Sequence, residues 1–583
     1  MSDPNFLSKE KIFLSERHEF DRLKKNEKMS KKLGTAVNIP SRKMVQSLTD
    51  CYKSGDLIKA SSLATSVTEK FPNYDYAWKI LVAALSGMGR YNEALTATQQ
   101  AIKFSPNDHQ SHSNLGALLL KLGRTNEAMA SCKRAISLEP NFAQAHYNLA
   151  NSLKDLNKLN EAVLSYTHAI NLNPNYFEAY YNLGNSLHDA DRLDEAEASY
   201  RQALAINPNF VLVYKNLGLL FTKRKQYDKA IEYHNKAILL DPDFVDAKFE
   251  LALLSIHEGQ FSSGFELYET RYHPNTTDRQ AIPPKISTPQ YQGKDLSLDI
   301  RGKHLFICSE QGVGDEAMFA SVLPELATIV KQDPNTRITL TCEPRLVELF
   351  NRSFDFLTAI PKPENHEYKT LEKELDYWIF IGSLPKLYRN KIEDFHNNQP
   401  YLAPDQSLVN VWNTRFNTLP HKTNIGISWR GGRERTNRVK RSLSLENMRP
   451  ILSRVNKNAN IINLQYGNHQ QEIQSFTEKT GITIFDWEDH DPIKDLNNFA
   501  AQISALDLVI SIDNSTVHFA GALGTEVYVL LPFNEDWRWL DHSTDSYWYP
   551  NLMTLFRQHS TGVWDDVINN VSSALDKNSM RSP

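Results

Sequence analysis

Small and apolar residues between positions 72 and 242 recur with a period of 34 residues. Proline stands at 72, 106, 140, 174, 208 and 242, each time in a tripeptide such as FPN, EPN or DPD. One unit carries Gly116 at its eighth position and Ala128 at its twentieth, where small side chains let two antiparallel helices approach closely. The proline cannot continue the second helix and sets the turn into the next unit. The pattern therefore predicts a row of helix pairs.

The period and these positions resemble the tetratricopeptide repeat, because all six registers agree. We count five full repeats over residues 75–244, with a degenerate unit before them (41–74) and another after them (245–273). We therefore expect an α-solenoid over 41–275, behind a lysine-rich, flexible or helical N-terminal extension at 1–40. Such a solenoid usually presents a concave groove to a peptide or protein. The alternative is that it only holds the rest of the chain in place or mediates oligomerisation.

Three asparagines occupy the same position of successive repeats. Asn148, Asn182 and Asn216 stand at the sixth position of their units. We interpret this ladder as binding the backbone of an acceptor peptide, with a solvated polar position as the alternative.

The rhythm stops after residue 275. The segment 276–300 is polar and contains prolines, which predicts a linker. Short β-branched and aromatic runs then alternate with helical stretches, and the runs that read as strands are 304–310, 337–343, 377–383, 424–430, 460–466, 507–513 and 527–532. Continuous apolar strands between helices predict buried parallel sheets. We expect an α/β region with two Rossmann-like halves, at 301–405 and 421–578, and a ligand cleft at the carboxyl ends of their strands.

The loop after the first predicted strand carries two glycines and an acid. Gly312 and Gly314 allow the backbone to come close to a ligand, and Asp315 falls near the start of the next helix. A carboxylate at this place fits a general base that deprotonates an acceptor hydroxyl. The alternative role for Asp315 is a helix cap, since Asp is favoured there for that reason alone.

A basic loop follows the predicted strand 424–430. Six basic residues stand against one acid in it, namely Arg430, Arg433, Arg435, Arg438, Lys440 and Arg441. The pair Gly431 and Gly432 suits close approach to an anion, and arginine binds phosphate through two parallel hydrogen bonds. We interpret the loop as a diphosphate site that includes Arg430, Gly431 and Arg433. The alternatives are a solvated charge run and a nucleic-acid site, and the chain has no recognisable nucleic-acid-binding module.

Side-chain oxygens gather after the predicted strand 507–513. Asp513, Asn514, Ser515 and Thr516 precede or begin a helix whose first N–H groups form a ready anion site. His518 lies in the first turn, where the helix dipole favours neutral imidazole. We expect these residues to contact a phosphate-bearing ligand, although a first-turn histidine often only packs.

Five Trp or Tyr residues crowd the stretch 532–558. These rings are suited to stacking on a base or sugar, and equally to packing the carboxyl-terminal helix across the cleft between the halves.

Composition limits the classes of protein that remain. A net charge of -4 over 583 residues is too small to imply a polyanionic or membrane partner through the bulk field. The four cysteines are widely scattered, which argues against a zinc site or a disulfide framework. No secretory signal or run of membrane-spanning length is present, so we expect a cytoplasmic protein.

The pattern D-x-x-x-x-H-x-A-x-x-L-G, which begins at Asp513, resembles the nucleotide-sugar motif of the heptosyltransferase-like glycosyltransferases of family 9. With SEQGVGDEAMFASVLPEL, ISWRGG and PFNEDWRW, the chain from about residue 41 resembles bacterial proteins that fuse tetratricopeptide repeats to such a domain. The resemblance implies a GT-B fold and a metal-independent, inverting transferase with Asp315 as base. It also implies a nucleoside diphosphate sugar as co-substrate and no other cofactor.

The leading hypothesis is a glycosyltransferase that acts on a protein or glycan acceptor recruited by the repeats. One alternative is a non-catalytic tetratricopeptide scaffold with a degenerate transferase domain. Another is an enzyme like protein O-GlcNAc transferase, which shares the plan of repeats followed by a GT-B domain.

Overall fold

The computed structural model describes residues 39–277, 281–363, 368, 372–395, 399–431, 441–541 and 543–579. The chain divides into two compact units between Leu220 and Phe221. The first unit is helical, and the second contains the last helices of the repeat series and two parallel sheets.

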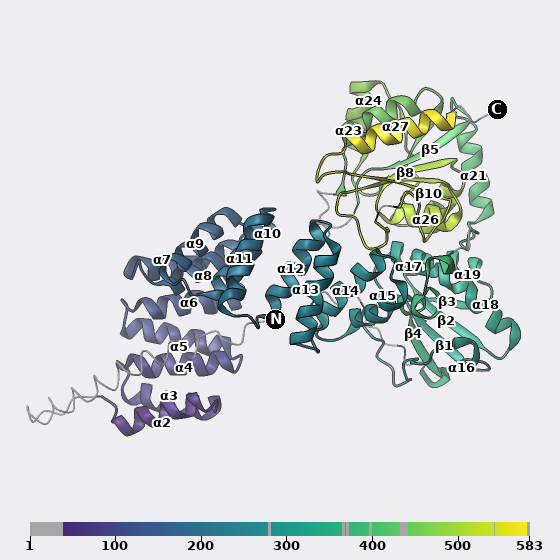
Figure 1. The fold of residues 1–583 in the computed structure, drawn as a ribbon. Helices are drawn as coiled ribbons and strands as arrows, with labels where there is room; N and C mark the ends of the chain where they lie inside the picture. The colour runs from purple at the N-terminus through teal and green to yellow at the C-terminus, as the bar shows by residue number, and fades with distance from the viewer. Residues whose placement is uncertain are drawn as a thin grey trace, which may run out of the picture. The chain divides into compact units, whose positions relative to one another are not determined.

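Helices in the front part of the chain come in pairs (Figure 1), and from α4 onward the pairs begin 34 residues apart. The pairs are α2 (Arg42–Lys53) and α3 (Leu57–Lys70), α4 (Asp75–Gly87) and α5 (Tyr91–Phe104), α6 (His109–Lys121) and α7 (Thr125–Leu138), α8 (Ala143–Asp155) and α9 (Leu159–Leu172), α10 (Phe177–Asp189) and α11 (Leu193–Ile206), α12 (Val211–Lys223) and α13 (Tyr227–Leu240), and α14 (Val245–His257) and α15 (Phe261–Tyr268). A short 3₁₀ helix, η1 (Glu269–Tyr272), follows the last pair. The five pairs predicted over 75–244 and the flanking units on either side are confirmed.

Close approach within a pair explains the small residues of the repeat. A Cβ atom added to Gly116 of α6 would lie 2.4 Å from Sγ of Cys132 and 3.2 Å from the carbonyl oxygen of Ala128. Ala128 itself, at the twentieth position, is fully buried. The spacing of small residues thus sets how closely the two helices pack.

The turn inside each pair places one residue in the left-handed region of the backbone. Its φ lies between 55° and 83° in the seven pairs, at Gly55, Gly89, Gly123, Asn157, Asp191, Lys225 and Gly259. Gly, Asn and Asp are the residues that tolerate this conformation best, so Lys225 is an exception.

The first sheet has four parallel strands. They are β1 (His304–Cys308), β2 (Arg337–Cys342), β3 (Thr358–Pro361) and β4 (Tyr377–Phe380), in the order β3-β2-β1-β4. Helices α17 (Val313–Phe319), α18 (Leu323–Gln332) and α19 (Val347–Ser353) connect them. This order, which starts in the middle and reverses at β1 and β4, is that of a doubly wound fold.

The second sheet has six parallel strands in the order β10-β9-β8-β5-β6-β7. They are β5 (Thr423–Ser428), β6 (Ala459–Asn463), β7 (Ile484–Phe485), β8 (Leu508–Ile512), β9 (Val527–Leu531) and β10 (Met553–Arg557). Helices α23 (Leu445–Val455), α24 (Gln470–Thr480) and α27 (Asp565–Ser579) cover one face, and α21 (Gln406–Phe416), α25 (Leu496–Ser504) and α26 (Ser515–Leu523) cover the other (Figure 1). The strand order is that of a complete Rossmann fold.

The seven strands that the sequence predicts are all present, and three further strands were missed. β7 has only two residues, β3 is short and partly exposed, and β10 lies inside the stretch that sequence analysis treated as an aromatic loop. The predicted linker contributes to the first sheet, because Tyr291 N donates to the carbonyl oxygen of Trp378 (2.7 Å).

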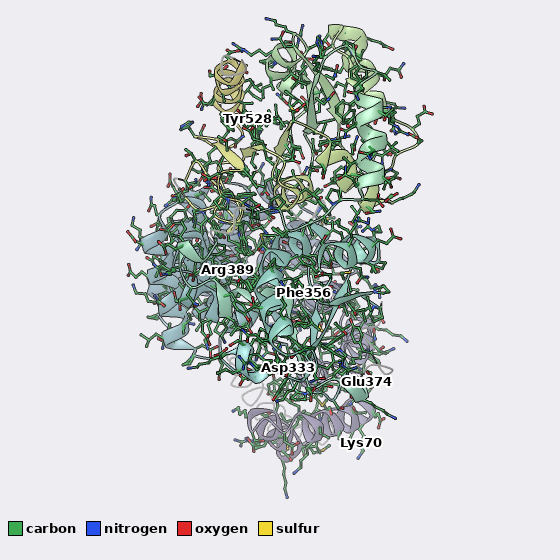
Figure 2. All side chains as sticks on the ribbon, turned by 90° about the vertical axis from the view of Figure 1, so that its right-hand side faces the viewer. Lys70, Asp333, Phe356, Glu374, Arg389 and Tyr528 are labelled. Atoms are coloured by element: carbon green, nitrogen blue, oxygen red, sulfur yellow. The ribbon has the colours of Figure 1, made fainter. Side chains whose placement is uncertain are left out.

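One hydrophobic core joins three parts of the second unit. It contains side chains of α14 and α15, of the first sheet and its helices, and of the inner face of the second sheet. A separate core lies on the other face of the second sheet, where Tyr528 of β9 (labelled in Figure 2) packs with residues of α23, α24 and α27. The last helical pair and both sheets therefore form one packed unit. No helix in the described part of the chain is long and apolar enough to cross a membrane.

Candidate active site

The strand order reverses at one place in each sheet, and ligands of this fold class bind at such places. In the first sheet the reversal lies between β1 and β4, and in the second between β5 and β8. The loops that sequence analysis singled out follow β1, β5 and β8. The sequence-predicted residues therefore lie at the carboxyl ends of the strands that flank these two places.

The loops of the two sheets contact each other. A Cβ atom on Gly314 of α17 would lie 3.1 Å from Cα of Ser515 and 3.3 Å from Cδ2 of His518, both in α26. Within the second sheet, a Cβ atom on Gly431, after β5, would lie 2.8 Å from Cβ of Asn514, after β8. The glycines are thus needed for close packing, and the first turns of α17 and α26 meet.

Asp315 lies at the third position of α17 and its carboxylate has two partners. Oδ2 accepts a hydrogen bond from Gly312 N (3.1 Å), which is the capping role that the sequence left open. The other oxygen, Oδ1, forms an ion pair with Nη2 of Arg538, and the Asp315 side chain is 21% exposed. Asp315 therefore caps the start of α17, and its role as a base stays a prediction.

Arg538 is a residue of the site that sequence reasoning missed. Its guanidinium contacts Asp315 and Asp536, donates to Oε1 of Gln311 (3.1 Å) and lies over the ring of Trp537. Burial by itself would lower the pKa of Arg538, but the carboxylates of Asp315 and Asp536 raise it well above its usual value. Arg538 stands inside the aromatic stretch 532–558, and no local pattern shows which acid it pairs with.

Asn514 is the N-cap of α26 and joins two strands of the second sheet. Its Oδ1 accepts from Thr516 N (2.9 Å), and its Nδ2 donates to Oγ of Ser428 at the end of β5 (2.8 Å). Among the described residues the fully buried Thr516 hydroxyl has no hydrogen-bond partner. Gly524, with φ 84°, ends the helix. The start of α26 thus combines a fixed cap with an unused hydroxyl.

His518 is buried beside the same helix start. Its ring stacks on Trp539 with centroids 5.7 Å apart, and Nδ1 lies 3.2 Å from the hydroxyl of Tyr549. Burial, reinforced by the charge of Arg538, lowers the pKa of His518 to about 4. The imidazole is therefore neutral near pH 7, and burial is the largest cause of the lowered pKa.

The predicted basic loop is only partly described. Arg433, Arg435, Arg438 and Lys440 lie outside the described residues. Arg441 Nη2 pairs with Oδ2 of Asp513 (2.6 Å), so Asp513 holds a basic residue of the loop. Arg430 is directed away from α26, because its Nη2 donates to the carbonyl oxygen of Asn468 (2.6 Å) and lies 3.4 Å from Glu472.

Rings of the aromatic stretch 532–558 pack against α15 and against Phe395, which follows the first sheet. Tyr547 contacts the rings of Phe261 and Phe395, and Trp537 contacts Tyr268. The carboxyl-terminal helix α27 packs instead on α23 and β10. The hypothesis that these rings pack α27 across the cleft is therefore wrong, because α27 belongs to the opposite face of the second sheet.

An ion pair buried next to the β1 loop was also missed. Arg271 of η1 donates from Nε and Nη2 to the two carboxylate oxygens of Glu310 (2.9 and 2.8 Å), and Nη2 also donates to Oγ of Ser383 (2.9 Å). The side chains of Arg271 and Glu310 are both 0% exposed. A Cβ atom on Gly382 would lie 1.9 Å from Oε1 of Glu310. The last helical pair is thus fixed to the ends of β1 and β4.

The asparagine ladder links successive repeats. Asn148 Nδ2 donates to the carbonyl oxygen of Ser113 (3.1 Å), and Asn182 Nδ2 donates to the hydroxyl of Tyr147 (2.7 Å). Asn216 Nδ2 donates to Oδ1 of Asn185 (2.6 Å). Each amide contacts the preceding repeat, while contact with an acceptor peptide stays a prediction.

Comparison with known proteins concerns mainly the repeats. Residues 109–142, 177–210 and 211–244 match a family model described as tetratricopeptide repeat, 87–123 and 150–191 match one described as TPR repeat, and 131–163 match a further tetratricopeptide repeat model. Protein FlbA from Caulobacter vibrioides is 31% identical over 330 residues, which are 54% of this chain and 52% of FlbA. The chain therefore spans about half the length of this relative.

Solved structures match about a third of the chain. MamA is 26% identical with a TM-score of 0.26, over 28% of this chain and 95% of MamA. A thermophilic TPR protein of Thermus thermophilus, TTC0263, is 25% identical with a TM-score of 0.28, over 31% and 98%. YrrB, a TPR protein with an unusual peptide-binding site, is 22% identical with a TM-score of 0.27, over 32% and 95%. By its helix pairs and its family matches, the front part of this chain is a tetratricopeptide repeat solenoid. A region with two parallel sheets follows it.

Proposed function

We propose that the chain is a glycosyltransferase that moves a sugar from a nucleoside diphosphate sugar to a protein or glycan acceptor. In this proposal the two sheets are the halves of a GT-B fold, and the repeats recruit the acceptor in the cytoplasm. The observation that supports it is the meeting of α17 and α26, which brings Asp315 of one half near His518 of the other, around the guanidinium of Arg538.

The start of α26 is the proposed diphosphate site. Helix N-termini bind anions through unpaired N–H groups, and the buried hydroxyl of Thr516 adds a donor that has no partner within the residues that the structure describes. Neutral His518 is able to donate one more hydrogen bond, and Arg441 supplies positive charge at the end of β8. These groups stabilise the negative charge that develops on the leaving diphosphate.

Asp315 is the proposed base. The acceptor oxygen attacks the anomeric carbon, the bond from that carbon to the diphosphate oxygen breaks, and the acceptor proton passes to Asp315. Arg538 must first leave Asp315, and the incoming diphosphate is the anion that attracts it. The Arg538 guanidinium then pairs with the diphosphate, while Asp315 is freed to accept the proton.

A donor screen tests the proposal. The full chain is incubated with UDP-, GDP- and ADP-sugars while nucleotide release is measured, and binding is measured by calorimetry. Losing a charge-assisted hydrogen bond in Arg441→Ala should weaken nucleotide binding about tenfold. Asp315→Asn should abolish turnover and leave binding intact. The matched control is Asp405→Asn, which changes the cap of α21. Absence of nucleotide binding at millimolar concentration would favour the non-catalytic scaffold.

A further inference from the structure

Lys225 occupies a backbone position that suits it poorly. It is the left-handed residue in the turn between α12 and α13, and the six equivalent turns have Gly, Asn or Asp at that place. Lysine has a Cβ atom and no short polar side chain to bond its own backbone, so this conformation is unfavourable for it. A residue that breaks a local rule is retained when contacts elsewhere compensate.

The contacts of Lys225 lie in the loop between β9 and β10, residues 532–552. Its Nζ atom is 3.1 and 3.0 Å from the two carboxylate oxygens of Glu535 and 3.5 Å from Oδ1 of Asp541. It also lies over the ring of Phe533, 5.0 Å from the centroid. The Glu535 side chain is 0% exposed and is also 3.3 Å from Nε of Arg557. A buried carboxylate needs such partners, and Lys225 supplies the closest one.

The same loop carries the residues that contact the proposed active site. Arg538, three residues after Glu535, pairs with Asp315, and Trp539 stacks on His518. The Glu535 anchor lies on one side of these contacts. On the other side, Gln311 accepts from Arg538 and donates to the hydroxyl of Tyr268 in α15 (2.6 Å). Residues of the repeat series thus contact Glu535 and Gln311, which lie in the two segments that carry Arg538 and Asp315.

We propose that Lys225 is a positioning residue, which fixes the 533–541 loop through Glu535 and thereby keeps Trp539 on His518 and the backbone of Arg538 where its guanidinium reaches both Asp315 and the incoming diphosphate. Its effect on catalysis rests on the glycosyltransferase proposal, whereas its effect on the loop does not. The last complete repeat is then part of the machinery of the site, in addition to any role in recruiting an acceptor.

Substitution by glycine separates this role from stability of the turn. Gly is the preferred residue at the position, so Lys225→Gly removes the ion pair while relieving the backbone. Relief of the backbone offsets only part of the stability lost when the buried Glu535 carboxylate keeps Arg557 but loses Lys225, so we expect the thermal midpoint to fall moderately. Amide hydrogen exchange of the 533–541 peptide should become at least about tenfold faster. The matched control is Asn157→Gly, an exposed residue at the same place two repeats earlier, which should leave that peptide unchanged.

Enzymatic readouts follow from the same variants. With a donor from the screen, Lys225→Gly should lower kcat about tenfold and change the KM for the donor by less than about threefold, because misplacing a catalytic group affects the transition state most. Lys225→Arg, which retains the positive charge, should restore most of kcat. The double variant Lys225→Gly with Glu535→Gln should have a kcat little below that of either single variant, because both substitutions remove the same contact.

The outcomes separate the two proposals. Unchanged exchange of the 533–541 peptide in Lys225→Gly overturns the positioning role, as does a kcat equal to that of Asn157→Gly. Faster exchange in a chain that binds no nucleotide supports the role of Lys225 in holding the loop and refutes the glycosyltransferase proposal.

Discussion

Replacing Glu310 by Gln tests whether the buried pair with Arg271 fixes the last helical pair to the first sheet. The guanidinium and the carboxylate are both inaccessible to water, and two hydrogen bonds of 2.9 and 2.8 Å join them. Glu310→Gln leaves the positive charge of Arg271 with Glu269 as its remaining acidic partner. Removing one partner of a buried ion pair typically costs about 3–5 kcal/mol, and the Glu269 contact places the expected loss near the lower bound, about 3 kcal/mol.

Unfolding followed by tryptophan fluorescence reports this change selectively. Of the nine tryptophans, only Trp78 lies before the division at Leu220, so eight report on the second unit. With an unfolding entropy of about 2.1 cal/mol/K per residue over the second unit, Phe221–Pro583, each kcal/mol shifts the midpoint by about 1.3 °C, so the midpoint should fall by about 4 °C. Circular dichroism at 222 nm, which is dominated by the repeats, should shift less.

A double substitution supplies the control. Arg271→Met with Glu310→Gln removes both charges and keeps the volume of the side chains, so it should be less destabilising than Glu310→Gln alone. Additive losses in the double variant would show that the pair contributes no interaction. A loss below about 1 kcal/mol in Glu310→Gln would refute the reasoning from burial.

Three further predictions follow from single residues. Gly264→Ala should destabilise the second unit by about 1–3 kcal/mol in urea titrations, because the new Cβ would lie 2.9 Å from the backbone nitrogen of Ile256; no loss would show that α14 and α15 can separate. The pKa of His518 is lowered from 6.5 to about 4, so its contribution to stability is present above pH 6.5 and is lost as the pH falls toward 4, by about 3 kcal/mol. His518→Gln should reduce the change of the thermal midpoint with pH between those values. A midpoint that depends on pH as it does in the unchanged chain would contradict the lowered pKa of His518. Asn182→Ala removes the hydrogen bond to Tyr147 and should cost the first unit about 1 kcal/mol, measured by circular dichroism in urea.

Periodicity made the front part of the chain predictable. Each small residue and proline of one repeat is confirmed by its equivalents in the others, so helix starts follow within a few residues of the expected places. The strands were predictable where five buried residues, four of them apolar, follow one another, as in β1 and β8. The two-residue β7 has no such run, and β10 begins after a stretch whose aromatic residues dominate the pattern.

The candidate site was predictable only in part. Parallel strands end at one edge, so Gly314 and Ser515 could each be placed at a sheet edge from the sequence alone. The partners Asp315 and Arg538 are 223 residues apart, and the pairing depends on how two sheets and a helical pair pack. Lys225 did carry a local signal, since it breaks the run of Gly, Asn and Asp at the turn, but its partner lies 310 residues away.

In the first sheet, the place where the strand order reverses is occupied by protein side chains. We therefore expect the second sheet to bind the phosphates in the proposed reaction. The place between β1 and β4 is filled by Arg271 and Glu310, and Gly382 has no room even for a Cβ atom. An anion could enter only by displacing a carboxylate that already neutralises the arginine. The equivalent place between β5 and β8 instead presents the capped start of α26 with the Thr516 hydroxyl, which has no hydrogen-bond partner in the described part of the chain. The donor is therefore expected on the second half, and the first half contributes chiefly the carboxylate of Asp315.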